Sequence, residues 1–85
     1  MKNNSRIEAR IKHAIVGEFR IADRYLSSET NFKEDLGFDD YDMLFLSLAL
    51  EDEFELLFTE QLEFEEMRDL VKLVSDQLKT DTYIN

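Results

Sequence analysis

Hydrophobic residues recur every three or four positions over most of this chain, which is the spacing of an amphipathic α-helix. This pattern predicts helices over residues 5–19, from Asp39 or Asp40 to about Phe54, and over residues 65–78. The apolar positions that carry it are Ile7, Ile11, Ala14, Ile15 and Phe19, then Met43, Leu46, Leu50 and Phe54, and finally Met67, Leu70, Val71, Val74 and Leu78. A second apolar stripe on the middle helix leaves little of its surface polar.

Two connections complete the predicted architecture. Residues 20–38 show no sustained period and predict a long loop, and residues 55–64 predict a loop with a short helix. The loop residues apolar enough to fold back over the helices are Ile21, Tyr25, Leu26 and Phe32, followed by Leu56, Leu57, Phe58, Leu62 and Phe64. The expected fold is all-α: a small four-helix bundle of three long helices and one short one, in a single domain over residues 1–85 with its core in about 5–78 and a frayed tail at 79–85.

Short-range side-chain interactions favour the first helix. Ser5 stands at the position of an N-cap with Glu8 three residues on, which is the capping-box arrangement. Glu8 and Lys12 form a favourable pair four residues apart. Gly17 lies inside the helix and costs about 1 kcal/mol relative to alanine, which close packing against another helix would explain.

Acidic residues are concentrated in the middle of the chain. The net charge is -10 over 85 residues, and fourteen acidic residues and one base, Lys33, lie between Glu29 and Glu66. Such a negative field repels nucleic-acid phosphates and attracts basic protein surfaces. An acidic face that only contacts solvent would give the same charge pattern. No apolar run approaches the length of a membrane span. We therefore expect a soluble, cytoplasmic protein that binds no nucleic acid.

Residues suited to catalysis or metal binding are scarce. The chain has no cysteine, and its one histidine, His13, falls opposite the apolar stripe and should be exposed. Asn31, Lys33 and Asp35 have the spacing of a calcium loop, but a lysine cannot ligate calcium and the required late glutamate is missing. Nucleophile elbows and phosphate-binding glycine loops are absent as well. We expect the protein to have neither enzymatic activity nor a metal site.

The stretch from Phe32 to Phe54 has a recognisable order: an acidic-Asp-Leu-Gly segment, carboxylates at a helix start, and an apolar helix ending in acids and a phenylalanine. The segments that carry this order are Glu34–Gly37, Asp39–Tyr41 and Glu51–Phe54. They resemble the acyl carrier proteins, small acidic helical bundles that tether acyl chains through phosphopantetheine. The resemblance covers roughly residues 7–78, and it implies the same bundle with a long first loop and a core phenylalanine at Phe32.

The resemblance places Asp40 where that family has the serine that carries its prosthetic group. A carboxylate has no hydroxyl to attack coenzyme A, so we expect no phosphopantetheine and no other cofactor. Two roles stay open for Asp40: negative charge at a helix N-terminus, or a mimic of the phosphate that a modified carrier holds there. Ser47 lies in mid-helix and is not assigned the prosthetic group.

In acyl carrier proteins the second helix recognises partners, with an acidic residue at the place of Phe45. The resemblance implies an outward-facing, partner-binding set: Asp39, Asp40, Tyr41, Leu44, Phe45, Leu48, Glu51 and Asp52. Phe45 would replace a steering charge by an aromatic anchor, a residue type that dominates interface energies. If the helix were instead rolled about its axis, Phe45 would be buried.

Three functions follow from these features. The first is a pseudo-carrier that binds a protein partner with a basic and apolar patch, non-covalently, through its second helix. The second is participation in fatty acid, lipid or polyketide biosynthesis, by docking onto such enzymes or regulating them. The third is a structural homodimer built on the exposed stripe of the same helix.

Overall fold

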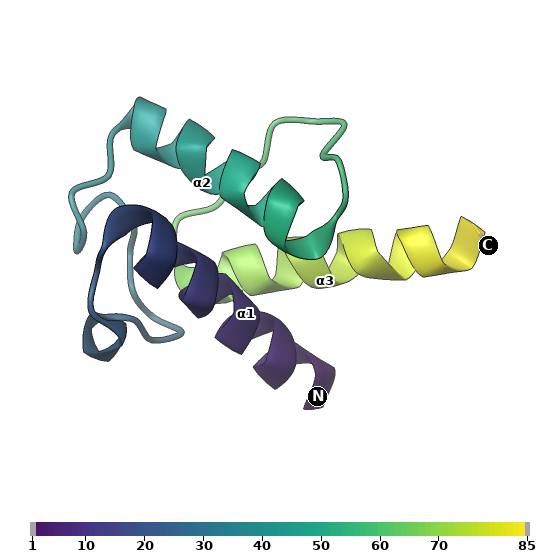
Figure 1. Cartoon of the computed structure of the whole chain (residues 1–85), viewed down its shortest axis with the longest axis horizontal. Helices are drawn as coiled ribbons and strands as arrows, with labels where there is room; N and C mark the ends of the chain where they lie inside the picture. The colour runs from purple at the N-terminus through teal and green to yellow at the C-terminus, as the bar shows by residue number, and fades with distance from the viewer. Residues whose placement is uncertain (1, 85) are drawn as a thin grey trace.

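The protein is all-α in the part that the structure, a computed structural model, describes: the backbone of residues 2–84 and the side chains of residues 5–79. Its elements, in chain order, are helix α1 (Lys2–Phe19), the 3₁₀-helix η1 (Asp23–Tyr25), α2 (Asp40–Phe54) and α3 (Met67–Ile84). The long loop between the first two α-helices is present as predicted (Figure 1).

Helix α1 packs against both of the other α-helices. Among the described residues, no Cα atoms of α2 and α3 come within 8 Å of each other. Figure 1 shows the chain between them, residues 55–66, swinging out beside α2 before it returns to α3. The connecting segment therefore borders the space beside α2 and α3, while both helices contribute buried side chains to one core.

The core draws on all three helices and on the first loop. Its largest fully buried side chains are Phe32, Ile11, Ile15, Leu46, Leu50, Met67, Leu70 and Val74. All of them except Phe32 belong to the three predicted apolar stripes, so the helical periodicity identified the core correctly.

The first loop is held to the bundle by aromatic side chains. The ring of Phe32 lies 5.7 Å from that of Phe38 and 5.3 Å from that of Phe64, the latter edge-on. Leu26 is buried as well. The prediction that the loop folds back over the helices is confirmed at Leu26 and Phe32 but wrong at Tyr25, whose side chain is 59% exposed.

The same loop also provides hydrogen-bond acceptors for the backbone N–H groups at the start of α3. The backbone N–H groups of Met67 and Arg68 donate to the carbonyl oxygens of Thr30 and Ser28, each at 2.9 Å. The N–H of Phe32 donates to the Glu65 carbonyl at 3.0 Å. Backbone carbonyls from a distant loop thus replace a side-chain cap for the otherwise unpaired first turn.

Two local predictions for α1 are wrong. The helix begins at Lys2, so Ser5 lies inside it and the predicted capping box with Glu8 does not form. Glu8 instead pairs with Lys12 at 3.3 Å, as predicted, and accepts a hydrogen bond from Ser28 Oγ at 3.2 Å. Gly17 is exposed, and a Cβ added there would meet nothing within 4 Å. Close packing therefore does not explain this glycine.

The predicted short helix within residues 55–64 is absent from the described chain, which has three α-helices where four were expected. The half-buried Leu62 and Phe64 alternate with the exposed Glu63 and Glu65, a period of two that favours extended backbone over a helix. The last predicted helix is α3, which begins two residues later than expected and runs to Ile84. Fraying of the tail at 79–85 stays a prediction, because Asn85 and the side chains from residue 80 onward lie outside the described part.

Candidate functional site

The start of α2 is fixed by two aspartates that cap it reciprocally. Asp39 is the N-cap: its carboxylate accepts the N–H of Asp42 at 2.8 Å, and the Asp42 carboxylate accepts the N–H of Asp39 at 3.1 Å. The helix therefore begins where the sequence predicted. Asp40 takes no part in this capping box, and its side chain is 96% exposed, 3.6 Å from the Lys33 ammonium.

The turn before α2 uses the side chains that had the spacing of a calcium loop. Asn31 Oδ1 accepts the backbone N–H groups of Lys33 and Glu34, while Asp35 Oδ2 accepts the N–H of Asn31 at 2.8 Å. Gly37, at φ 72°, supplies the left-handed residue that ends this turn. In the described part of the chain, no group of three or more histidine or acidic side chains is placed to hold a metal ion.

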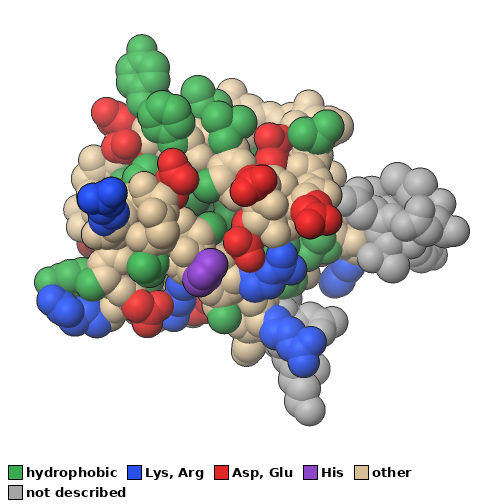
Figure 2. Space-filling model, viewed as in Figure 1, with side chains coloured by type: hydrophobic (Ala, Val, Ile, Leu, Met, Phe, Trp, Pro, Cys, Tyr) green, Lys and Arg blue, Asp and Glu red, His purple; other side chains and the backbone are tan. Residues whose placement is uncertain are grey.

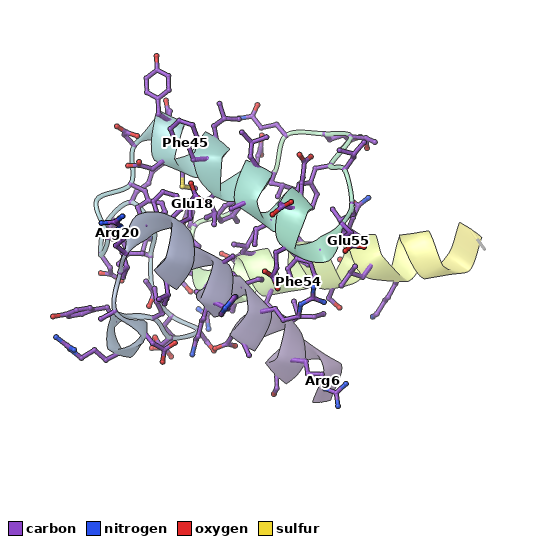
Figure 3. The ribbon with its side chains drawn as sticks, viewed as in Figure 1. Arg6, Glu18, Arg20, Phe45, Phe54 and Glu55 are labelled. Atoms are coloured by element: carbon purple, nitrogen blue, oxygen red, sulfur yellow. The ribbon has the colours of Figure 1, made fainter. Side chains whose placement is uncertain are left out.

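Helix α2 is apolar on two sides, only one of which is covered. Leu46, Leu50 and Phe54 are buried against the bundle. On the other side the exposed large hydrophobic residues are Tyr41, Leu44, Phe45 and Leu48. Phe45 is 49% exposed, so the helix is not rolled to bury it (Figure 3). Figure 2 shows hydrophobic side chains gathered along the edge of the molecule where α2 lies, with acidic side chains beside them.

One acidic side chain at the C-terminal end of α2 makes a hydrogen bond within the fold. Glu51 is half-buried, and its Oε2 accepts the backbone N–H of Phe58 at 2.8 Å, which holds the start of the following segment. Asp52 is exposed. Of the two acids expected at the end of a partner-binding face, only Asp52 lies fully available to solvent, while Glu51 keeps one carboxylate oxygen occupied.

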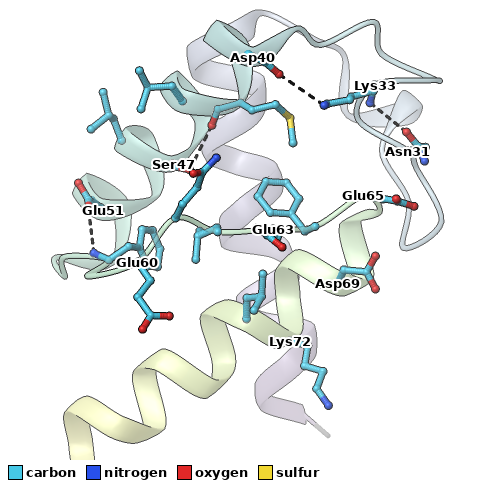
Figure 4. Close-up of a pocket in the computed structure, with 18 of the residues that line it drawn as sticks. Asn31, Lys33, Asp40, Ser47, Glu51, Glu60, Glu63, Glu65, Asp69 and Lys72 are labelled. Atoms are coloured by element: carbon cyan, nitrogen blue, oxygen red, sulfur yellow. Dashed lines mark hydrogen bonds and ion pairs between the residues drawn. The ribbon is translucent and has the colours of Figure 1, made fainter.

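An open groove of about 1280 Å³ lies beside this exposed face, between α2, the segment 58–65 and α3 (Figure 4). Leu44 and Leu48 line it from α2, and Leu73 lines it from α3. The half-buried Ser47 also faces it, with its hydroxyl donating to the Met43 carbonyl at 3.2 Å. That bond satisfies the serine hydroxyl within its own helix.

Sequence reasoning missed the groove and placed one residue of the connecting segment wrongly. The signal for the groove was the alternation of apolar and acidic residues from Leu62 to Glu65, which had been taken for part of a short helix. Leu57 was expected to fold back over the helices, and this prediction is wrong: at 75% exposed it is the most exposed large hydrophobic residue of the described chain. His13 is exposed as expected, with its Nδ1 3.9 Å from Glu53 Oε1.

No family model matches the sequence. The helices that the structure describes include none that is both long enough and apolar enough to cross a membrane. The function must therefore be argued from the exposed face of α2 and the groove beside it.

Proposed function

We propose that this protein is an acyl-carrier-protein-like module that carries no phosphopantetheine and binds a protein partner non-covalently through α2. The observation that carries the proposal is the uncovered apolar stripe on α2: Tyr41, Leu44, Phe45 and Leu48 face solvent while the opposite side of the helix fills the core. Exposed apolar stripes with a polar rim are typical of interaction sites.

The charge around this stripe supports a basic partner. Asp40 and Asp52 are exposed at the two ends of α2, and neither the first nor the last turn of the helix holds a basic residue. Opposite charges across an interface raise the association rate and suppress wrong partners. A partner with a basic and apolar patch, such as an enzyme of fatty acid, lipid or polyketide assembly, suits this arrangement.

The position of Asp40 supports the loss of the prosthetic group. It lies in the first turn of α2, exposed beside the loop, and capping is performed by Asp39. The fold therefore uses the Asp40 carboxylate only for its favourable charge near the helix N-terminus and for an exposed ion pair with Lys33. A serine there would be reachable by a modifying enzyme.

Intact mass after incubation with coenzyme A and a broad-specificity phosphopantetheinyl transferase tests the carrier-like surface. We expect no mass gain on the wild type and a phosphopantetheine-sized gain on Asp40→Ser, with Asp40→Ala as the matched control. A gain on the wild type would overturn the proposal by revealing another modified hydroxyl. No gain on Asp40→Ser would count against a surface like that of a carrier.

Partner binding is tested by placing a photoreactive amino acid at Phe45 and, as control, at the exposed aromatic Tyr25 on η1. In the native cell, we expect a defined cross-linked protein from position 45 alone. The purified partner should then lose its binding to Phe45→Glu. Cross-linking of a second copy of this chain from position 45 would favour the homodimer instead.

A further inference from the structure

The groove beside α2 is lined by apolar side chains that the fold leaves open. These are Met43, Leu44, Leu48, Phe58, Leu62, Phe64 and Leu73, and each of them is either half-buried or exposed. They come from α2, from the connecting segment and from α3. The backbones of α2 and α3 stay more than 8 Å apart at their Cα atoms, and no helix of the described chain covers this lining.

Carboxylates surround this apolar lining. Seven acidic residues and two lysines contribute to the groove, the acids being Glu34, Asp40, Glu51, Glu60, Glu63, Glu65 and Asp69. Figure 4 shows Asp40 and Glu51 on α2, Glu60, Glu63 and Glu65 on the connecting segment, and Asp69 on α3. The lysines are Lys33, which lies beside Asp40, and Lys72.

Several of these carboxylates have no partner among the residues that the structure describes. Asp40, Glu51 and Asp69 interact with Lys33, Phe58 N–H and Glu66 N–H respectively. Glu60, Glu63 and Glu65 form no ion pair and no side-chain hydrogen bond with any residue that the structure describes. Like charges held around one groove repel each other, and a cationic occupant relieves that repulsion.

The groove is distinct from the outer part of the α2 face. Leu44 and Leu48 line it, whereas Tyr41 and Phe45 do not. A partner that touched only the outer part would use α2 alone. One that entered the groove would also contact the segment 58–65 and Leu73 of α3.

We propose that the groove accepts one segment of a partner protein, an amphipathic peptide whose aliphatic side chains lie on the apolar lining while flanking lysines or arginines meet the carboxylates. This deepens the proposed function and rests on it, because the groove shares Leu44 and Leu48 with the α2 face. Nucleic acid and anionic lipid surfaces do not fit, since their phosphates would face the acidic rim. A second copy of this chain would bring like charge against like charge.

Backbone amide chemical-shift mapping of the ¹⁵N-labelled wild-type protein tests the proposal. The probe is a synthetic leucine–lysine amphipathic peptide of about twelve residues, roughly 18 Å long as a helix. Its control is the same peptide with glutamate in place of every lysine. We expect shifts at residues 58–65, Ser47 and Leu73 with the lysine peptide, weakening as salt is added, and none with the glutamate peptide.

Charge variants supply the matched control. Glu60→Lys with Glu63→Lys reverses two unpartnered rim charges, and Glu18→Lys with Asp23→Lys makes the same change in net charge on exposed residues that do not line the groove. We expect the groove variant to weaken binding of the lysine peptide by roughly tenfold or more. The control variant should bind within about twofold of the wild type.

Three results would overturn the proposal. These are equal binding of the two peptides, equal weakening by the two variants, and shifts confined to Tyr41, Phe45 and their neighbours on the outer face. The wild-type map stands even if a charge variant fails to fold. If the peptide does not bind the groove, the phosphopantetheine and cross-linking results are unaffected. The two proposals can therefore fail separately.

Discussion

Arg10 joins the first helix to the end of the second through Glu53. Its Nε lies 3.1 Å from Glu53 Oε2, and its Nη2 donates to the Glu53 backbone carbonyl. The guanidinium carbon also lies 4.3 Å from the centroid of the Phe54 ring. One side chain thus satisfies a carbonyl at the C-terminal end of α2 and covers an aromatic ring of the core.

We expect Arg10→Ala to lower the free energy of unfolding by about 1–2 kcal/mol, because a partly exposed ion pair and a cation–π contact are lost together. Arg6→Ala is the matched control, since Arg6 is an exposed arginine of the same helix, and it should change stability by less than about 0.5 kcal/mol. Urea unfolding followed by circular dichroism measures both. Equal effects would mean that the contact with Glu53 contributes nothing.

The two aspartates at the start of α2 should differ sharply. Asp39→Ala removes the N-cap and should cost about 1 kcal/mol. Asp40→Ala removes an exposed carboxylate with one weak ion pair, and should cost less than about 0.5 kcal/mol. Thermal or urea unfolding of the two variants tests this difference. A larger loss at Asp40 would show that the fold, and not a binding role, requires its charge.

Phe45 and Leu46 are adjacent on α2, but Phe45 is exposed while Leu46 is fully buried. Phe45→Glu should leave the helical circular dichroism spectrum intact, since the side chain is half exposed, and should abolish partner binding. Leu46→Glu places an unpaired charge at a position with no solvent exposure and should unfold the domain. A folded Leu46→Glu protein, or an unfolded Phe45→Glu protein, would contradict the orientation of the helix.

Glu55 ends α2 in the left-handed conformation, at φ 55° and ψ 50°. Glycine adopts this conformation without the clash that a Cβ introduces, so Glu55→Gly should raise the free energy of unfolding by about 0.5–1 kcal/mol. Gly37, at φ 72°, provides the opposite case: Gly37→Ala should destabilise by about 1 kcal/mol. Urea midpoints that moved in the same direction for both variants would refute this account.

Much of the helical frame could be predicted because its determinants are local. Leu46 and Leu50 are buried where the three-to-four-residue spacing places them, and Asp39 caps the helix through chemistry contained within four residues. The burial of Phe32 was also expected, from the resemblance to carrier proteins. The exposure of Tyr41, Leu44, Phe45 and Leu48 follows from the same helical geometry once one stripe is committed to the core.

The parts that could not be predicted depend on contacts between distant residues. The first turn of α3 is satisfied by the carbonyls of Ser28 and Thr30, and no side-chain signal in the sequence marks such a bond. Likewise, Phe64 packs against Phe32 from a non-helical segment, so its spacing from Leu62 was misread as part of a helix. The groove lies beside this segment, because residues 58–65 line it and do not form the short helix that the sequence predicted.

The contacts of α1 with both other α-helices also constrain how the chain folds. During synthesis α1 and α2 can pair once residue 54 has emerged, whereas α3 completes the fold by a contact that spans nearly the whole sequence. Without α1, the other two helices would lose the element that packs against both of them. We therefore expect the chain to lose its structure in a single cooperative transition, with no surviving pair formed by α2 and α3.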